Sequence, residues 1–508
     1  MTQITHLGQA ARAAAAQFGE KQALVFDGEA FTFNQLDHLV EKVAAGLVAA
    51  GVDQGDVVTL YAGNSWQWIV SYYAIARAGA VINPINTMLT PDEVRFVVSD
   101  CRASAIIVSE DKAEAAASVL EDVKLAVVIG EGTETLTSFD SLIGGDSPAL
   151  HDIEVDEDSL STICYTSGTT GHPKGAMQSH KAVITNGAMT AQMQGRGPHD
   201  TVLSALPCPH VYANVVMQSM MLYGSTLILH DRFDPTTFLA DITAYEATVI
   251  DGVPTMYMFL LNDSALSQAN LSSLTRCYVG GQTMPVATME QVEATFGVPL
   301  VELWGMTEIA GLGTTHPLNG KAVPGSIGVA LPYCQVRVAS PDAPDVALPE
   351  GEDGELQLRG PITMMGYFGN EEQTKATLLP NGWLRTGDIA RIEEDGKVFI
   401  VDRLKDMIIS GGFNIYPAEI ERVLAMHPDV ALAAVGKQDD EVKGEIAIAF
   451  VVPKQNAGPD KDAITAHCRD HLAAYKCPRD VVFVVDVPKT STGKIMRRAL
   501  GARYQPET

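Results

Sequence analysis

The sequence lacks the long apolar runs that would place it in a membrane or send it out of the cell. Its 508 residues contain no stretch of about 18 unbroken apolar residues, the length that spans a bilayer. The nearest candidate, 211–229, is interrupted at Asn214, Gln218, Ser219, Gly224 and Ser225. The N-terminus also lacks the sustained apolar core of a secretory signal peptide. We therefore expect a soluble, cytoplasmic protein with no transmembrane segment.

Paired cysteines and metal-binding clusters are also absent. Seven cysteines are scattered through the chain, and none belongs to a CxxC pair. This pattern favours a reduced chain over a disulfide framework. Cys468, between His467 and His471, is the nearest approach to a metal site. It has no further cluster of ligands, so we interpret it as part of a solvated helix face.

Basic residues are few compared with acidic ones. The chain has 62 acidic and 35 basic side chains, which gives a formal net charge of −27. Such a charge repels nucleic acids and anionic membrane surfaces, so neither is an expected partner. An anionic ligand must then be held by local cations and Mg²⁺.

One segment is dense in groups that bind anions: YTSGTTGHPKG, from Tyr165 to Gly175. Its glycines let backbone N–H groups approach an anion closely, and Lys174 adds a positive charge. Four hydroxyl residues add donors: Thr166, Ser167, Thr169 and Thr170. The segment is not a Walker A loop, because that motif ends in Gly-Lys-Ser/Thr. It therefore predicts a phosphate-binding loop of another kind, although a Gly/Thr-rich surface turn has a similar composition.

Alternating helix and strand signals predict parallel sheets wrapped by helices. The length suggests two to four units. We expect a large N-terminal domain, residues 1–404, of two helix-wrapped β-sheets plus a distorted β-barrel from about 323 to 401. A small mobile α+β domain, 405–508, would follow. Strands are predicted at 57–61, 105–108, 125–129, 161–165, 226–229, 248–251, 276–279 and 300–303, and helices at 66–78, from Thr90 to about Ser99 and from about Ser179, directly after the phosphate loop.

Four further segments carry polar groups that suit a nucleotide. Each has a structural alternative: a buried Trp with a loop for the first, a Gly-Asp turn for the second, a solvated turn for the third, and a solvated terminal lysine for the fourth. The segments are Trp304-Gly-Met-Thr-Glu308, Arg385-Thr-Gly-Asp388, the charged stretch 401–421 with Gly411-Gly412, and Pro488-Lys-Thr-Ser-Thr-Gly-Lys494.

In order and spacing, the five segments resemble the motifs of the adenylate-forming superfamily, and the resemblance covers essentially the whole chain. Within that superfamily the chain is similar to a short acid–CoA ligase (acyl-CoA synthetase, AMP-forming). The resemblance implies ATP, Mg²⁺ and CoA as ligands and a two-step reaction. A carboxylate first attacks the α-phosphate of ATP to give an acyl-adenylate and pyrophosphate, and CoA then displaces AMP.

The resemblance also implies roles for individual residues. Lys494 would bridge the acid and the α-phosphate, Thr307 would bind the α-phosphate, and Glu308 would hold Mg²⁺. The nucleotide would contact Thr166, Ser167, Gly168, Thr169, Thr170, Lys174, Gly281, Gln282, Glu302, Leu303, Trp304, Gly305, Met306, Thr307, Asp388 and Arg403.

For the second half-reaction, the resemblance implies that the terminal domain rotates about a hinge near Lys405. Rotation would remove Lys494 from the site and bring the segment with Gly411, Gly412 and Phe413 to CoA. A homodimer is left open by the sequence.

The acyl pocket is expected around the loop Pro207-Cys-Pro-His-Val-Tyr212. His210 would line or gate it, although a structural role for this residue is the alternative. The expected lining is His210, Val211, Tyr212, Val253, Tyr257, Met306 and Gly311. With no Arg beside His210 for a second carboxylate, we expect a monocarboxylic acid, preferably a medium- or long-chain fatty acid.

Three alternatives stay open at this stage. The first is an aryl acid–CoA ligase for a benzoate- or cinnamate-like acid. The second is a stand-alone adenylation enzyme that loads a carrier protein. The third, from a different class, is a nucleotide-binding protein without catalysis.

Overall fold

The structure, a computed structural model, forms two units by contact between residues. The first unit consists of Met1–Gly281, Thr288–Gln335 and Leu358–Leu384, and the second of Gln282–Ala287, Val336–Gln357 and Arg385–Thr508. The structure describes residues 4–145, 150, 153–166, 173–411, 413–440, 442–454, 458, 460–488 and 495–500. The predicted boundary between domains 1–404 and 405–508 marks an expected hinge. Dividing the chain into units by their contacts does not test where such a hinge lies.

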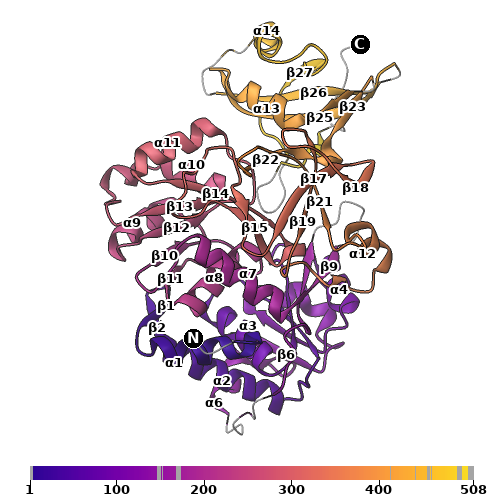
Figure 1. Ribbon diagram of the computed structural model, residues 1–508. Helices are drawn as coiled ribbons and strands as arrows, with labels where there is room; N and C mark the ends of the chain where they lie inside the picture. Colours follow the sequence, from indigo (N-terminus) through magenta and orange to yellow (C-terminus); the bar gives the residue numbers. More distant parts are fainter. Residues whose placement is uncertain are drawn as a thin grey trace. The chain divides into compact units, whose positions relative to one another are not determined.

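A nine-stranded mixed sheet forms one half of the first unit (Figure 1). Its central strands run parallel, and antiparallel strands add to both edges. In spatial order the strands are β16 (Val329–Ala330), β15 (Gly311–Thr315), β14 (Leu300–Met306), β13 (Arg276–Val279), β12 (Val249–Gly252), β10 (Thr201–Ser204), β11 (Thr226–Leu229), β1 (Gln22–Phe26) and β2 (Glu29–Thr32).

An eight-stranded sheet forms the other half of the first unit. Six of its strands run parallel from β8 to β7, and β9 and β20 extend it antiparallel. In spatial order the strands are β20 (Gly366–Tyr367), β9 (Lys174–Ser179), β8 (Leu160–Thr166), β4 (Val81–Pro84), β3 (Val57–Tyr61), β5 (Ala105–Ser109), β6 (Leu125–Ile129) and β7 (Thr137–Ser138).

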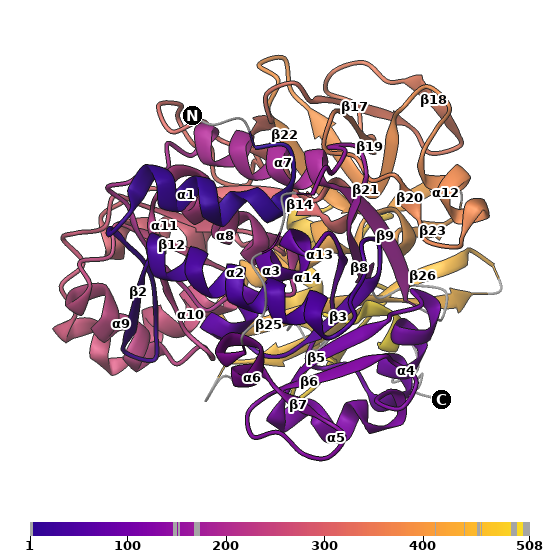
Figure 2. The same ribbon diagram turned by 90° about the horizontal axis from the view of Figure 1, so that it is seen from below.

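Helices cover these sheets, and two of them are almost wholly buried. α3 (Trp66–Arg77) and α8 (Val211–Tyr223) lie between the sheets (Figure 2), and the Tyr73 hydroxyl of α3 donates to Gln218 Oε1 of α8 at 3.3 Å. The other helices are α1 (Ala10–Phe18), α2 (Phe33–Ala49), α4 (Pro91–Asp100), α5 (Ala113–Ala116), α6 (Phe139–Gly144), α7 (His180–Met193), α9 (Pro235–Ala244), α10 (Pro254–Asn262), α11 (Val286–Phe296), α12 (Glu371–Thr377), α13 (Pro417–Ala425) and α14 (Lys461–His471).

Local signals fix several helix starts. Thr90 accepts a hydrogen bond from Glu93 N, and the Glu93 side chain accepts from Thr90 N, so the predicted capping box opens α4 with Pro91 in its first turn. Ser179 caps α7 by accepting from Ala182 N. These side chains satisfy backbone donors that the helix itself leaves unpaired.

One predicted connection was wrong. The phosphate loop does not lead directly from β8 into α7, because β9 intervenes and pairs antiparallel with β8. The loop therefore closes a hairpin, and Thr166 and Lys174 face each other as its last paired residues.

The second unit contains two five-stranded sheets. The region predicted as a barrel or meander forms β18 (Ala343–Ala347), β17 (Gln335–Ser340), β19 (Gly354–Arg359), β21 (Leu384–Ile392) and β22 (Val398–Arg403), in that spatial order. The terminal α+β region forms β24 (Phe413–Ile415), β23 (Ile408–Ser410), β26 (Gly444–Pro453) and β25 (Val430–Asp440), with β27 (Asp480–Phe483) beside β26. An apolar core that includes Ile420, Val435 and Ile464 joins α13 and α14 to this sheet.

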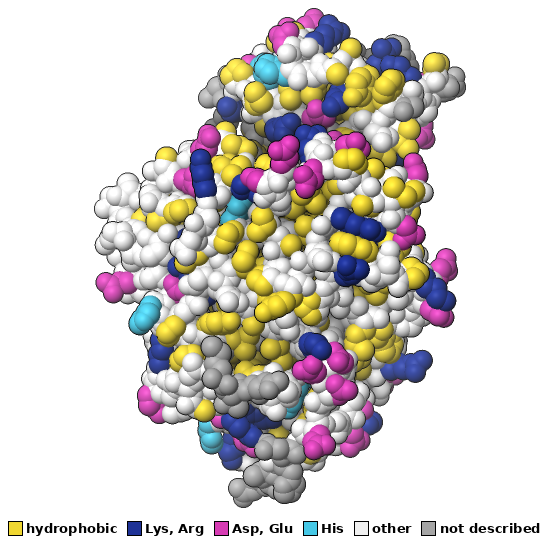
Figure 3. Space-filling view, in the orientation of Figure 1, with side chains coloured by type: hydrophobic (Ala, Val, Ile, Leu, Met, Phe, Trp, Pro, Cys, Tyr) yellow, Lys and Arg dark blue, Asp and Glu magenta, His cyan; other side chains and the backbone are white. Residues whose placement is uncertain are grey.

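In the part of the chain that the structure describes, no helix combines the length and the apolar character needed to cross a membrane. Acidic and basic side chains are interspersed on the face shown in Figure 3, within each unit.

Candidate active site

The end of β14 gathers polar and aromatic groups in the first unit. Strands β10, β12, β13 and β14 run parallel, so their carboxyl ends share one edge, where α/β proteins bind ligands. Glu302 and Trp304 are buried on β14, with Leu303 between them. Glu302 Oε2 accepts from Gly325 N at 2.8 Å, which holds the next loop against the strand.

Two glycines allow β14 and β15 to pack at very short range. A Cβ atom on Gly305 would lie 2.0 Å from Gly311 O. Gly311 has φ +146°, and its Cβ would lie 2.5 Å from Val215 Cγ2 of α8. Larger side chains would force these elements apart. This close packing places Met306 and Thr307 at the turn that follows β14.

Glu308 is the buried carboxylate of this turn, with 7% of its surface exposed. Tyr367, on β20, donates its hydroxyl to Glu308 Oε1 at 2.8 Å. Burial, and next the charge of Glu308, raise the pKa of Tyr367 well above its usual value, so the phenol stays a donor. Gln178 of β9 donates to Thr307 O at 2.8 Å and fixes the backbone beside it.

Lys174, at the end of the predicted phosphate loop, contacts the same residue, Tyr367. Its Nζ lies 5.4 Å from the centroid of the Tyr367 ring and donates to Gln373 Oε1 at 2.5 Å. The structure thus brings Lys174 and Glu308 to one aromatic side chain. The predicted phosphate-binding residues Ser167, Gly168, Thr169 and Thr170 lie outside the described residues.

In the second unit, Asp388 and Arg403 are brought together. They face each other across β21 and β22, and Arg403 Nε lies 2.6 Å from Asp388 Oδ1. Asp388 is 3% exposed, whereas the Arg403 side chain is 47% exposed. The carboxylate is therefore oriented by an arginine that remains accessible to a ligand.

The segment around Lys405 carries a second group of charges. Lys405 lies in a short 3₁₀ turn, Leu404–Asp406, and the ion pairs around it centre on Arg497. The Arg497 guanidinium contacts Glu421 at 2.6 Å, Asp406 at 3.0 Å and Asp402 at 3.1 Å. One arginine thus joins the expected hinge to α13.

Burial raises the pKa of Asp402 to about 6, although Arg497 and the N–H groups of Ala418 and Arg403 oppose the rise. Because an unfolded Asp titrates near 3.9, the native state binds more protons between about pH 4 and 6. The stability of the second unit should therefore fall as the pH rises through this window, by up to about 3 kcal/mol, and level off above it.

This dependence can be measured by urea unfolding with pulsed hydrogen exchange in β25 and β26, in wild type and Asp402→Asn at each pH. The asparagine variant should lack this component, since it cannot titrate. A wild-type stability that rises relative to the variant between pH 4 and 6 would contradict the assigned shift.

Two of the residues expected to bind CoA, Gly411 and Phe413, lie at the β23–β24 hairpin. Gly411 is exposed at its turn, and Phe413 is 56% exposed with its ring centroid 4.8 Å from that of Tyr475. Gly412 and Lys494 lie outside the described residues. The roles of all four stay predictions.

The expected acyl-binding residues cluster around α8 and α10. His210 caps α8, and its Nδ1 accepts from Tyr212 N at 3.2 Å. Tyr257 is fully buried and donates to Tyr278 O at 2.7 Å. Val211 and Tyr212 are also buried, and Val253 immediately precedes α10. Gly281 ends the first segment of the first unit, whereas Gln282 groups with the second unit.

Sequence reasoning missed three residues that hold the β14 turn in place. Besides Gln178 and Tyr367, Asn186 of α7 donates its Nδ2 to Ile309 O and Leu312 O, both at 2.8 Å. Each contact joins segments more than fifty residues apart, and an isolated Asn, Gln or Tyr carries no local signal for it.

Glu308 suits a magnesium ion that is held mainly by phosphates. Mg²⁺ prefers oxygen and is often bound by one or two carboxylates plus substrate phosphates. Among the described residues, no group of three or more His, Cys, Asp or Glu side chains is arranged to hold a metal by itself. A single buried carboxylate, Glu308, that shares a tyrosine with Lys174 fits that chemistry.

Comparison with known families matches both units. The description "AMP-binding enzyme" fits residues 11–368, and "AMP-binding enzyme C-terminal domain" fits residues 419–494.

Individual relatives align over nearly their whole length. A Mycobacterium tuberculosis protein, named as the CoA ligase of a methyl-dioxo-octahydroindenyl propanoyl group, is 34% identical over 95% of this chain and 96% of its own. A long-chain-fatty-acid–CoA ligase of Bacillus subtilis is 33% identical over 96% of this chain and 92% of its own. The crystal structure of ATP-bound MatB from Rhodopseudomonas palustris superposes with a TM-score of 0.90 at 32% identity, covering 97% of this chain and 99% of that one.

Proposed function

This chain belongs to the AMP-binding enzyme family, and on that premise we propose that it is an ATP-dependent acid–CoA ligase. It activates a monocarboxylic acid as an acyl-adenylate, with release of pyrophosphate, and transfers the acyl group to CoA, with release of AMP. A medium- or long-chain fatty acid is the preferred substrate, and an aryl acid is the alternative. We place the protein in the cytoplasm.

The observation that carries this proposal is the meeting of Lys174 and Glu308 at Tyr367. A cation from the end of an anion-binding loop and a buried carboxylate converge on one phenol. That arrangement suits a nucleotide whose phosphates need both a cation and a metal. Glu308 follows β14, and α/β proteins bind such ligands beyond the carboxyl ends of their parallel strands.

In the first half-reaction the acid is its own nucleophile, since a carboxylate is ionised at neutral pH and needs no general base. Lys494 offsets the negative charge that accumulates when the carboxylate meets the α-phosphate, and Thr307 donates to that phosphate. Preorganised charge of this kind is the usual source of catalysis in phosphoryl chemistry. Glu308 would hold Mg²⁺, which neutralises phosphate charge when bound.

The nucleoside contacts follow the roles that the family resemblance implies. Trp304, with its neighbours on β14, provides an aromatic face and backbone groups for adenine. Asp388 accepts the ribose hydroxyls, and Arg403 orients it through their ion pair. In the second half-reaction, rotation about Lys405 brings Gly411, Gly412 and Phe413 to CoA. The homodimer left open by the sequence stays a prediction.

The proposal is tested by the products. In a panel of fatty and aryl acids with ATP, Mg²⁺ and CoA, pyrophosphate and AMP should appear in equal amounts. AMP release should rise at least tenfold when CoA is added, because adenylate otherwise stays bound. Reactions without CoA, or with a carrier protein in its place, are the controls. Release of ADP, or a rate of AMP release that does not depend on CoA, would rule the proposal out.

A further inference from the structure

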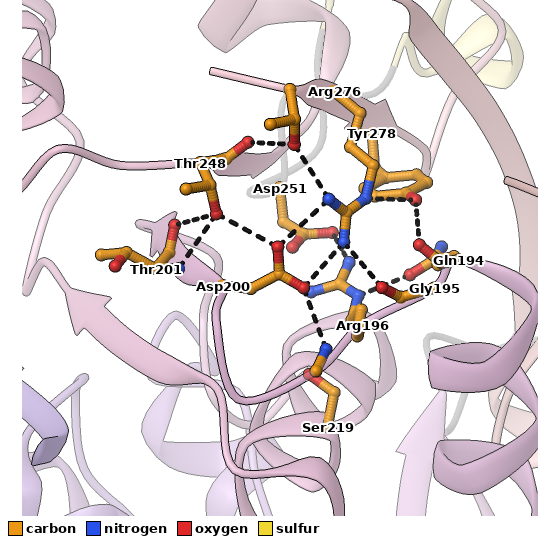
Figure 4. Close-up of polar contacts among 12 residues, drawn as sticks. Gln194, Gly195, Arg196, Asp200, Thr201, Ser219, Thr248, Asp251, Arg276 and Tyr278 are labelled. Atoms are coloured by element: carbon orange, nitrogen blue, oxygen red, sulfur yellow. Dashed lines mark hydrogen bonds and ion pairs between the residues drawn. The ribbon is translucent and has the colours of Figure 1, made fainter. Parts of the chain in front are cut away.

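A fully buried ion pair lies beside the expected acyl-binding residues. Arg196 Nη2 is 2.7 Å from Asp251 Oδ1, and the two side chains are 1% and 0% exposed (Figure 4). Gln194 Oε1 accepts from Arg196 Nε at 2.7 Å, and the guanidinium carbon lies 5.0 Å from the centroid of the Tyr278 ring. Tyr212 donates its hydroxyl to Asp251 Oδ1 at 3.1 Å. We call these five residues the Arg196–Asp251 cluster.

The cluster joins the end of β12 to the segment between α7 and β10, where Gln194 and Arg196 lie. Asp251 is the last but one residue of β12 and pairs with Ser204 of β10 and Tyr278 of β13. Through β13 it is level with Val301, near the start of β14, whereas Thr307 and Glu308 follow the end of that strand. Two residues further on, Val253 begins the turn into α10.

Tyr212 connects the cluster to α8. Its backbone N–H is bound by His210, and its hydroxyl is bound by Asp251, so both ends of this residue are held. Burial, followed by the charge of Asp251, raises the pKa of Tyr212 well above its usual value, and the hydroxyl therefore keeps its proton and donates. The position of Asp251 therefore determines the orientation of Tyr212 in the first turn of α8.

Three polar atoms of the cluster are buried without a hydrogen-bond partner among the described residues. They are Asp251 Oδ2, Arg196 Nη1 and Gln194 Nε2. Buried polar atoms are normally paired, because an unpaired one loses its hydration without compensation. One acceptor and two donors in one cluster are complementary to an oxygen group such as a hydroxyl.

Stability does not explain why the pair is charged. Desolvation of two buried charges largely cancels their attraction, and apolar replacements of such pairs are often neutral or stabilising. A charged pair that holds an expected acyl-binding residue, Tyr212, and has polar atoms without partners among the described residues is better explained by recognition.

We propose that Asp251 and Arg196 determine acyl specificity. They orient Tyr212 and provide a hydrogen-bonding end to the acyl-binding region, so that an acid with a hydroxyl or carbonyl oxygen distant from its carboxylate is preferred over the plain acid. This inference rests on the proposed acid–CoA ligase function. It narrows the substrate class from monocarboxylic acids in general to those that carry a second, uncharged oxygen group.

The chain supplies a matched control at the other end of the same strands. Arg276 is the first residue of β13, and its Nη2 lies 2.8 Å from Asp200 Oδ2, with both side chains largely buried (Figure 4). This second pair lies at the amino end of the parallel strands. Arg276 Nε donates to the Tyr278 hydroxyl at 3.1 Å, so the pair shares one partner with the cluster, while Asp200 itself is bound by Arg276, Thr248 and Gly197 N. Asp200→Asn should therefore lower stability without changing the preference among acids.

The test compares acids that differ by one oxygen: dodecanoic with ω-hydroxydodecanoic acid, and cinnamic with para-hydroxycinnamic acid. For at least one pair, wild type should show a kcat/KM at least tenfold higher for the hydroxylated acid. The double variant Arg196→Met/Asp251→Leu, which replaces both charges with apolar groups, should abolish or invert this ratio. Tyr212→Phe, which leaves the ion pair intact, should reduce it.

The outcomes separate this inference from the function on which it rests. Turnover of both acids of each pair at equal kcat/KM by wild type would overturn the inference and leave the ligase function standing. An unchanged ratio in both variants, or a change in Asp200→Asn as large as in the double variant, would also overturn it. No CoA-dependent AMP release from any acid would overturn the ligase function as well. If the double variant does not fold, the wild-type ratio and Tyr212→Phe decide.

Discussion

Replacing Lys494 with alanine should slow acyl-adenylate formation by roughly a thousandfold, the upper range for loss of one preorganised group that stabilises transition-state charge. The reason is that two anions, the carboxylate and the α-phosphate, meet in this step. ATP–pyrophosphate exchange measures it directly. Transfer of the acyl group from a supplied acyl-adenylate to CoA should change only a few-fold, because Lys494 is proposed to leave the site before that step.

Lys489→Ala is the matched control, since it removes the same charge from the same motif five residues earlier. It should leave both half-reactions within a few-fold of wild type. An equal fall of both half-reactions in Lys494→Ala would contradict the assignment of one lysine to one step, and with it the proposed rotation about Lys405.

Glu308→Gln should lower kcat/KM for the adenylation step by about a hundredfold, corresponding to roughly 3 kcal/mol of lost stabilisation. The amide keeps the shape of the side chain and removes the charge that would hold Mg²⁺. The Mg²⁺ concentration for half-maximal rate should rise together with the loss, which a titration of the metal at saturating ATP would show.

Tyr367→Phe tests the orientation of the Glu308 carboxylate while leaving its charge in place. It removes the hydroxyl that donates to Glu308 at 2.8 Å and keeps the ring beside Lys174. Loss of one hydrogen bond is worth about 1 kcal/mol, so a fall of about fivefold is expected. If Glu308→Gln were no worse than Tyr367→Phe, or needed no more Mg²⁺ than wild type, the carboxylate would not be the metal ligand.

Elements with strong local signals could be predicted from the sequence. The strands 57–61, 226–229 and 276–279 occur with the predicted bounds, because short apolar runs between turn residues define a buried strand. The start of α4 followed from Thr90, Pro91 and Glu93, which act within one turn. The overall fold class was confirmed for the same reason, since the alternation of such elements determines it.

Contacts between distant segments could not be predicted in this way. β9 is short and polar, and only its pairing with β8 makes it a strand. Tyr367 and Glu308 are 59 residues apart, and Arg196 and Asp251 are 55 apart. Motif resemblance named Glu308, Asp388 and Arg403, but it could not reveal Tyr367, which donates to Glu308, or the buried Arg196–Asp251 pair. The roles of the named residues stay predictions until the variants are measured.

The close packing of β14 against β15 has a consequence for protein engineering. Met306 and Gly311 belong to the expected acyl pocket, and enlarging or filling such a pocket is the usual aim of a mutant library. Any side chain at Gly305 would meet a backbone carbonyl at 2.0 Å, and one at Gly311 would collide with α8. Randomising these two codons would therefore return mostly misfolded protein, whereas diversity at Val253, a partly buried residue before α10, would alter selectivity in chains that still fold.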